Sequence, residues 1–324
     1  MPGNRQRLFT RAPALYMGNM LPSKLPTRVS VYEMAPRDGL QNESAQVATH
    51  AKVRLIEALV DAGIRRIEVG SFVAPKWVPQ MADADEVCRM IERRPGVTYA
   101  GLCPNARGLE RAIAAKVDEI AVFVSASETH NAKNVNKTTA QTLQAFEPVI
   151  GPAVERGLRV RGYVSTMWGC PYEGEIDPKR GLDLAKHLLD AGCYQVSLGD
   201  TIGVGTPVQT QRILDLFLAD IPVEQIALHL HDTRGTALAN VLVGLESGVT
   251  TFDASVAGLG GCPYAPGAAG NLATEDLVYT LHGMGIETGI DLEKLWQAGQ
   301  VAEAIVGREL PGKVHRAGVR SLAK

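Results

Sequence analysis

The chain has 324 residues, 45% of them hydrophobic, with 33 basic and 35 acidic side chains and a formal net charge of −2. This balance, with an aromatic content of 5%, lacks the basic patch or stacking rings of a nucleic-acid binder. No apolar run approaches the roughly 18 residues that suggest a membrane-spanning helix. We therefore expect neither nucleic acid nor a membrane as a partner.

Short β-rich runs alternate with amphipathic stretches of helical period along the chain. In chain order, the expected strand and helix pairs are 29–34 with 51–62, 67–70 with 83–93, 98–102 with 106–116, 120–124 with 139–156, 160–164 with 179–191, 195–198 with 208–218, 226–230 with 237–247, and 251–256 with 273–282. The first, fifth, seventh and eighth helices end on Gly63, Gly192, Gly248 and Gly283, a residue type favoured just after a helix.

Eight strand–helix units predict a parallel sheet covered by helices, and eight parallel strands close into a barrel. The alternative, an open doubly wound sheet, should carry a Gly-rich phosphate loop after its first strand, and the chain has no GxGxxG or GxxxxGK[ST] pattern. The sequence therefore predicts a (β/α)8 TIM barrel over 28–290. A basic N-terminal extension (1–27) precedes it, and a C-terminal helical segment and tail (291–324), with a helix at 292–306, follows it.

The five cysteines are scattered, and no CxxC pair occurs, which argues against a zinc knuckle or a thioredoxin-type site. Such a set is typical of reduced thiols in a reducing compartment, so we expect a cytoplasmic protein. The N-terminal extension has no acidic residue before Glu33, as in a transit peptide, but it is poor in serine. A mitochondrial matrix location is therefore the alternative to an extension that packs on the barrel floor.

Polar residues collect where the expected strands end, which is where TIM barrels carry their chemistry. His229 and His231 are two residues apart on the seventh strand, so both imidazoles face one side and can meet one metal ion. The spacing alone is also compatible with two hydrogen-bonded core histidines.

Barrel closure makes the seventh, eighth and first strands neighbours. Asp38, His229, His231 and Asn271 can then converge at the barrel mouth. Two imidazoles, a carboxylate and an amide oxygen suit octahedral Mg²⁺ or Mn²⁺, and imidazole also binds Zn²⁺ and Co²⁺ well. We therefore predict a divalent metal site.

Other reactive side chains near this mouth have two interpretations each. Arg37 either pairs with Glu43 or polarises an oxygen of an enolate. Cys262 lies in a glycine-rich loop, and a lone cysteine there is more often inert than catalytic. Glu68 and Asp200 are either solvated carboxylates or groups that orient Arg37 and the histidines.

Six stretches resemble the 3-hydroxy-3-methylglutaryl-CoA lyase family: 35–43, 67–81, 162–174, 197–207, 229–240 and 258–279. The family belongs to a group of barrel metallolyases with 2-isopropylmalate synthase and 4-hydroxy-2-oxovalerate aldolase. The wider group shares the RD and HxH elements, whereas the GGCPYA loop (260–265) is similar to the lyases in particular. The resemblance covers the chain from about residue 28 to 290.

The resemblance implies a role for each matching residue. The implied metal ligands are Asp38, His229, His231 and Asn271. The implied catalytic residues are Arg37 for the thioester enolate, Cys262 as catalytic cysteine, Asp38 or His229 as base, and Glu68 and Asp200 as supporting carboxylates. The implied substrate-binding residues are Arg37, Gln41, Ser71 and Thr201 in the pocket and Asn134 and Thr138 at the CoA arm.

The implied reaction is the retro-Claisen cleavage of 3-hydroxy-3-methylglutaryl-CoA to acetyl-CoA and acetoacetate, as in leucine degradation and ketone-body formation. The partner is a CoA thioester, and we expect a homo-oligomer, either a dimer or a tetramer. Ser44 stands where many family members have lysine, and Thr166 replaces a frequent cysteine. The alternatives are a condensing synthase of the same group, a lyase for a longer acyl chain, a non-haem Fe(II) oxygenase and a non-catalytic barrel.

Overall fold

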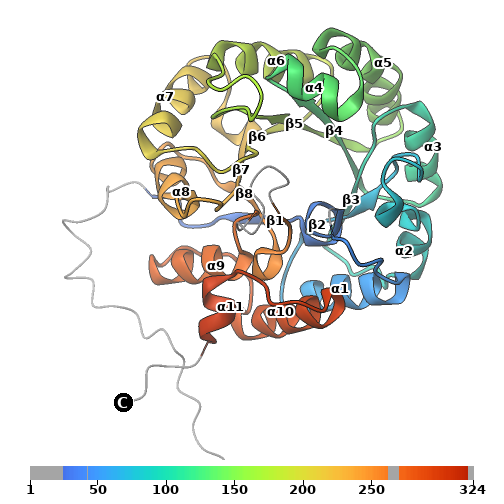
Figure 1. Ribbon diagram of the computed structural model, residues 1–324, viewed down its shortest axis with the longest axis vertical. Helices are drawn as coiled ribbons and strands as arrows, with labels where there is room; N and C mark the ends of the chain where they lie inside the picture. The colour runs from blue at the N-terminus through green and yellow to red at the C-terminus, as the bar shows by residue number, and fades with distance from the viewer. Residues whose placement is uncertain (1–24, 42, 262–269, 320–324) are drawn as a thin grey trace, which may run out of the picture.

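The structure, a computed structural model, describes residues 25–41, 43–261 and 270–319. Eight parallel strands form a closed barrel in sequence order, with β8 paired to β1, and helices surround it (Figure 1). The strands are β1 (Ser30–Glu33), β2 (Arg66–Ser71), β3 (Thr98–Leu102), β4 (Glu119–Ser125), β5 (Arg159–Ser165), β6 (Gln195–Asp200), β7 (Ile226–Leu230) and β8 (Thr251–Ala254). The predicted TIM barrel is confirmed.

The helices follow the predicted order. They are α1 (Thr49–Asp61), α2 (Ala84–Met90), α3 (Ala106–Ala114), α4 (Glu128–Val135), α5 (Thr139–Glu155), α6 (Pro178–Asp190), α7 (Pro207–Leu218), α8 (Ala237–Glu246), α9 (Thr274–Gly283), α10 (Leu292–Val306) and α11 (Lys313–Ala317). Four short turns, one π-helical and three 3-10, are η1 (Ala35–Gly39), η2 (Pro79–Met81), η3 (Val223–Gln225) and η4 (Val256–Gly258). Within the described ranges, no helix is long and apolar enough to span a membrane.

The predicted boundaries differ from the structure in a few places. The last strand was expected to reach Val256, but it ends at Ala254 because the 3-10 turn η4 begins at Val256 and Ala257 has a φ of 54°. Three predicted helix-ending glycines, Gly63, Gly192 and Gly248, have positive φ, whereas the helix α9 is followed by Gly285 in that conformation rather than by Gly283. Helices α4 and α11 were not predicted.

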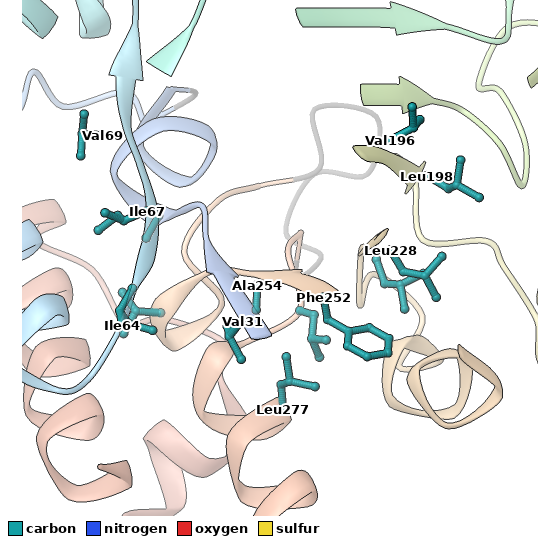
Figure 2. Packing of buried hydrophobic residues seen from close by; sticks show 14 of the residues in the cluster. Val31, Ile64, Ile67, Val69, Val196, Leu198, Leu228, Phe252, Ala254 and Leu277 are labelled. Atoms are coloured by element: carbon teal, nitrogen blue, oxygen red, sulfur yellow. The ribbon is translucent and has the colours of Figure 1, made fainter. Parts of the chain in front are cut away.

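Each strand alternates between two environments. Apolar side chains such as Ile67 and Val196 pack between the strands and the helices, as Figure 2 shows. Phe252, fully buried on β8, belongs to the same layer. Burying such a side chain contributes about 1.5–3 kcal/mol. The intervening residues face the barrel interior, so the inward-facing residues at the end of each strand can contribute side chains to a site at the barrel mouth.

Candidate metal centre and active site

The turn η1 places two reactive residues at the end of β1. The backbone N–H groups of Arg37 and Gly39 both donate to the carbonyl of Met34, at 3.1 and 3.2 Å, which closes the turn. Arg37 is buried and the Asp38 side chain is 24% exposed. The turn therefore presents Asp38 towards the open end of the barrel.

Three of the predicted metal ligands converge. The ligand atoms of Asp38, His229 and His231 all lie within 4.8 Å of one another, and the two imidazole rings are 5.2 Å apart. Asn271 donates from Nδ2 to Asp38 Oδ2 at 2.9 Å and forms a backbone bridge with His231. A possible metal-binding site is thus present where the sequence predicted it, and the role of each ligand stays a prediction.

The protonation states of these groups suit a cation. Burial and the neighbouring His229 lower the pKa of His231 to about 4, so its imidazole is neutral at pH 7. Burial alone would raise the pKa of Asp38, but Arg37 and the two histidines lower it to about 2. A carboxylate and a neutral imidazole are the forms that bind metals.

His231 also has a nitrogen without a partner. Its Nδ1 is buried and has no hydrogen-bond partner among the described residues. Leaving such a group unsatisfied costs about 1–3 kcal/mol. An imidazole with an unpartnered nitrogen, on a residue beside two further candidate ligands, therefore fits a divalent-cation site.

Arg37 binds two carboxylates. Its Nε and Nη2 atoms lie 2.8 and 2.7 Å from Glu68 Oε2, and its Nη1 lies 2.6 Å from Asp38 Oδ1. Burial disfavours the charged guanidinium, but the two carboxylates outweigh it and raise the pKa of Arg37 above its usual range. The alternative pairing with Glu43 is wrong, because Glu43 pairs with Arg308.

Sequence reasoning missed a buried group beneath the site. Asp253 on β8 lies with Oδ2 3.3 Å from His229 Nδ1, and Arg161 on β5 pairs with its Oδ1 at 2.7 Å. Ser197 donates to the same carboxylate at 2.8 Å. The signal was present: Asp253 is a carboxylate inside an apolar strand, and the barrel register places it opposite His229.

The other predicted residues lie at the mouth in different settings. Asp200 accepts hydrogen bonds from the backbone N–H groups of Val204 and Gly205, at 3.1 and 2.8 Å, so its described contacts hold its own loop rather than Arg37. The Thr201 hydroxyl accepts from the Thr166 N–H at 2.9 Å. Ser71 ends β2 and is buried, and Gln41 follows η1 and is partly buried.

The two predicted CoA contacts lie on the rim. Asn134 is exposed on α4, and Thr138 is exposed and caps α5 by accepting from the Gln141 N–H at 3.1 Å. Cys262 lies outside the described residues.

Known proteins are similar to this chain in sequence. The chain is 51% identical over 293 residues to the rat protein named hydroxymethylglutaryl-CoA lyase, mitochondrial, with 90% of each chain covered. It is 50% identical over 284 residues to the 3-hydroxy-3-isohexenylglutaryl-CoA/hydroxy-methylglutaryl-CoA lyase of Pseudomonas aeruginosa, covering 88% of this chain and 95% of that protein. Similar proteins include ones named as mitochondrial and as cytoplasmic.

A solved structure is similar to this chain in fold as well as in sequence. The HMG-CoA lyase of Acinetobacter baumannii, in complex with coenzyme A and 3-methylmalate, superposes with a TM-score of 0.87 at 41% identity and covers 92% of this chain and 98% of that one. The HMGL-like family profile matches residues 28–302, so the chain belongs to the HMGL-like family.

Proposed function

We propose that this chain is a metal-dependent carbon–carbon lyase that cleaves 3-hydroxy-3-methylglutaryl-CoA to acetyl-CoA and acetoacetate. The observation that carries the proposal is the convergence of Asp38, His229 and His231 within 4.8 Å, with the Arg37 guanidinium against Asp38. The relatives named above as lyases of this substrate support it.

Asp38, His229 and His231 would hold a divalent cation, and rotation of the Asn271 amide would add its oxygen. This mixed oxygen and nitrogen set favours Mg²⁺ or Mn²⁺, with Zn²⁺ or Co²⁺ as alternatives. When bound, such a cation acts as a Lewis acid that acidifies a substrate hydroxyl. Asp253 supports the site because its contact with Nδ1 of His229 leaves the lone pair of Nε2, the atom facing Asp38, free to bind the cation.

Asp38 is the proposed acceptor of the substrate's hydroxyl proton. A histidine nitrogen that binds a cation has no lone pair left for a proton, whereas a carboxylate has a second oxygen. Because the low pKa of Asp38 makes it a weak base, the hydroxyl must be acidic when the proton moves. Because a His229 nitrogen that binds the cation cannot carry a proton, Cys262 is the proposed donor of the proton that converts the enolate of acetyl-CoA to acetyl-CoA.

Arg37 is the proposed stabiliser of that enolate. As the carbon–carbon bond breaks, its electron pair passes into the thioester and negative charge develops on the thioester oxygen. Arg37 is buried and held by its ion pair with Glu68, and a preorganised cation there lowers the activation barrier for this charge development. Glu68 is thus a positioning residue for Arg37.

The substrate is a CoA thioester. We propose that Gln41, Ser71 and Thr201 line its acyl pocket, and that Asn134 and Thr138 contact the CoA arm, since α4 and the start of α5 follow the C-terminal end of β4. Coenzyme A in the Acinetobacter baumannii enzyme supports a CoA site in this fold. We further propose a homo-oligomer, a dimer or a tetramer, located in the cytoplasm.

A panel of thioesters tests the substrate assignment. Initial rates of thioester cleavage are compared for 3-hydroxy-3-methylglutaryl-CoA and 3-hydroxy-3-isohexenylglutaryl-CoA at fixed Mg²⁺. The proposal expects the methyl substrate to react with the higher kcat/KM. A higher kcat/KM for the isohexenyl substrate would replace it with a lyase for longer acyl chains.

A further inference from the structure

A short C-terminal segment contacts all three loops that carry the proposed metal ligands. These loops follow β1, β7 and β8 and bear Asp38, His231 and Asn271 respectively. The segment, residues 308–314, runs from the end of α10 into α11 and is here named the C-terminal strap. Figure 1 shows α11 beside α9 and α10, on the β8 and β1 side of the barrel.

The first contact is with the loop after β1. Arg308 Nε donates to Glu43 Oε2 at 3.1 Å, and its Nη2 binds the other carboxylate oxygen. The Glu43 side chain is only 8% exposed, whereas that of Arg308 is 43% exposed. An exposed cation thus covers a buried carboxylate five residues after Asp38.

The second contact is with the loop after β8. Gly312 donates its backbone N–H to the carbonyl of Ala257 at 2.8 Å, and Glu275 accepts the Ala257 N–H at 2.6 Å. Ala257 has a left-handed φ of 54°, which these two bonds hold. A Cβ on Gly312 would lie 2.9–3.0 Å from the Ala257 backbone, so the approach requires glycine.

This contact leads to the ligand Asn271. Two residues after Ala257, the Leu259 carbonyl accepts from Asn271 Nδ2 at 3.3 Å. The strap is therefore linked to Asn271 through the backbone of residues 257–259.

The third contact is with the loop after β7. Lys313 Nζ pairs with the carboxylate of Asp232, the residue next to His231. Asp232 is buried, donates its N–H to the Gly270 carbonyl at 2.7 Å and accepts from the Ala237 N–H at 3.0 Å. Its pairing with Lys313 thus restrains the backbone next to the His231 and Asn271 bridge, at Asp232 on one strand of the bridge and at Gly270 on the other.

We propose that the C-terminal strap positions the metal ligands, with Arg308, Gly312 and Lys313 as its positioning residues for divalent-cation binding. The cations of the two ion pairs, Arg308 and Lys313, are 43% and 63% exposed, and pairs open to solvent contribute little to fold stability, typically under about 1 kcal/mol. Each of these contacts instead restrains a loop beside a ligand, and preorganised ligands bind more tightly because less freedom is lost on binding. The inference rests on the proposed metal site.

The test measures Mn²⁺ binding to the full chain without substrate, by the EPR signal of free Mn²⁺. The variants are Lys313→Met, Arg308→Met and Gly312→Ala. Arg316→Met is the matched control, because Arg316 lies just beyond the strap and its ion pair among the described residues, 3.7 Å long, joins it to the exposed Glu309 within the strap rather than to a ligand loop. Thermal unfolding of each variant without cation is recorded alongside.

We expect Lys313→Met to weaken Mn²⁺ binding about 10-fold, the lower end of the loss for groups that support metal ligands. Lys313→Arg should restore the affinity. Arg308→Met and Gly312→Ala should also weaken Mn²⁺ binding, whereas Arg316→Met should bind Mn²⁺ as the wild type does. The unfolding temperatures of all charge variants should lie within a few degrees of that of the wild type.

His231→Ala separates the two proposals. If His231→Ala loses Mn²⁺ binding but Lys313→Met and Arg308→Met keep wild-type affinity, the strap inference is overturned and the metal site stands. If His231→Ala also binds Mn²⁺ normally, the metal site is wrong and the strap inference fails with it. An equal loss of affinity in Arg316→Met and Lys313→Met would overturn the strap as a specific positioning segment.

Discussion

Asp253 on β8 lies 3.3 Å from Nδ1 of His229 on β7, on the side of the ring away from Asp38. This carboxylate is itself held by Arg161 through two hydrogen bonds, at 2.7 and 3.1 Å. A histidine supported in this way has a fixed tautomer, with Nδ1 protonated and Nε2 free. The arrangement links the barrel interior to the proposed metal site.

The first prediction concerns the stability of this buried pair. Asp253→Asn leaves the Arg161 guanidinium, whose side chain is 0% exposed, without the carboxylate that directly pairs with it. Removing one partner of a buried pair costs about 3–5 kcal/mol, so the free energy of unfolding in urea should fall by that amount. Asp215→Asn, on an exposed turn of α7, is the control and should change it by less than about 0.5 kcal/mol. A loss below about 1 kcal/mol for Asp253→Asn would show that Arg161 finds another partner.

The second prediction is metal dependence. Cleavage activity should vanish after dialysis against excess EDTA and return with Mg²⁺ or Mn²⁺, because binding needs deprotonated ligands that are present at neutral pH. His231→Ala should lose activity that added metal does not restore, while its far-UV circular dichroism stays that of the wild type. Full activity in excess EDTA would remove the basis for the whole ligand set.

The third prediction concerns the cysteines. Burial raises the pKa of the Cys88 and Cys193 thiols to about 12, and Cys103 and Cys170 are buried as well. These four thiols should resist iodoacetamide at pH 7, since the thiolate is the reactive form. Alkylation mapped by mass spectrometry should therefore fall on Cys262, inactivate the enzyme and be slowed by substrate.

A substitution at the same residue measures its chemical contribution. As a proton donor, Cys262 should contribute about 10²–10⁴-fold, so Cys262→Ser should lower kcat by that factor with little change in KM. Cys193→Ser, at a buried thiol away from the site, is the control. Turnover of Cys262→Ser within a few-fold of the wild type would make this cysteine a bystander.

The fourth prediction concerns Arg37. Because the enolate charge appears only as the bond breaks, Arg37→Gln should lower kcat far more than it changes KM. Losing one such donor costs about 3–4 kcal/mol, or 10²–10³-fold in kcat. Arg316→Gln is the control. Arg308→Gln is not suitable, because Arg308 belongs to the C-terminal strap. A rise in KM at unchanged kcat would indicate that Arg37 only binds substrate.

The sequence predicted the barrel because buried parallel strands leave a repeated local pattern. Each of the eight strands is a short apolar run, and each is followed by an amphipathic stretch. Helix α11 escaped prediction because its five residues are too few to show a helical period, and α4 because its eight residues are mostly polar. Helix α4 is capped by Ser127, the residue before its first turn, whose hydroxyl accepts from the His130 N–H, and the apolar pattern does not reveal this cap.

The site was predictable as far as its residues stand at strand ends. His229 and His231 share a face by spacing alone, and barrel closure brings Asp38 to them. Asp253 was missed because its role depends on the register between β7 and β8, which no local pattern encodes. Lys313 was missed for a similar reason, since its partner Asp232 is 81 residues away in the chain.

The direct test of the proposed activity is the stoichiometry of its products. The purified chain with Mg²⁺ is given 3-hydroxy-3-methylglutaryl-CoA, and acetyl-CoA and acetoacetate are quantified over time by chromatography. The lyase account predicts that the two products appear together in a one-to-one ratio, with no free CoA released. Contradiction would come from an enzyme that leaves this thioester intact and instead consumes acetyl-CoA only when a 2-oxo acid is supplied, releasing free CoA as a condensing synthase does.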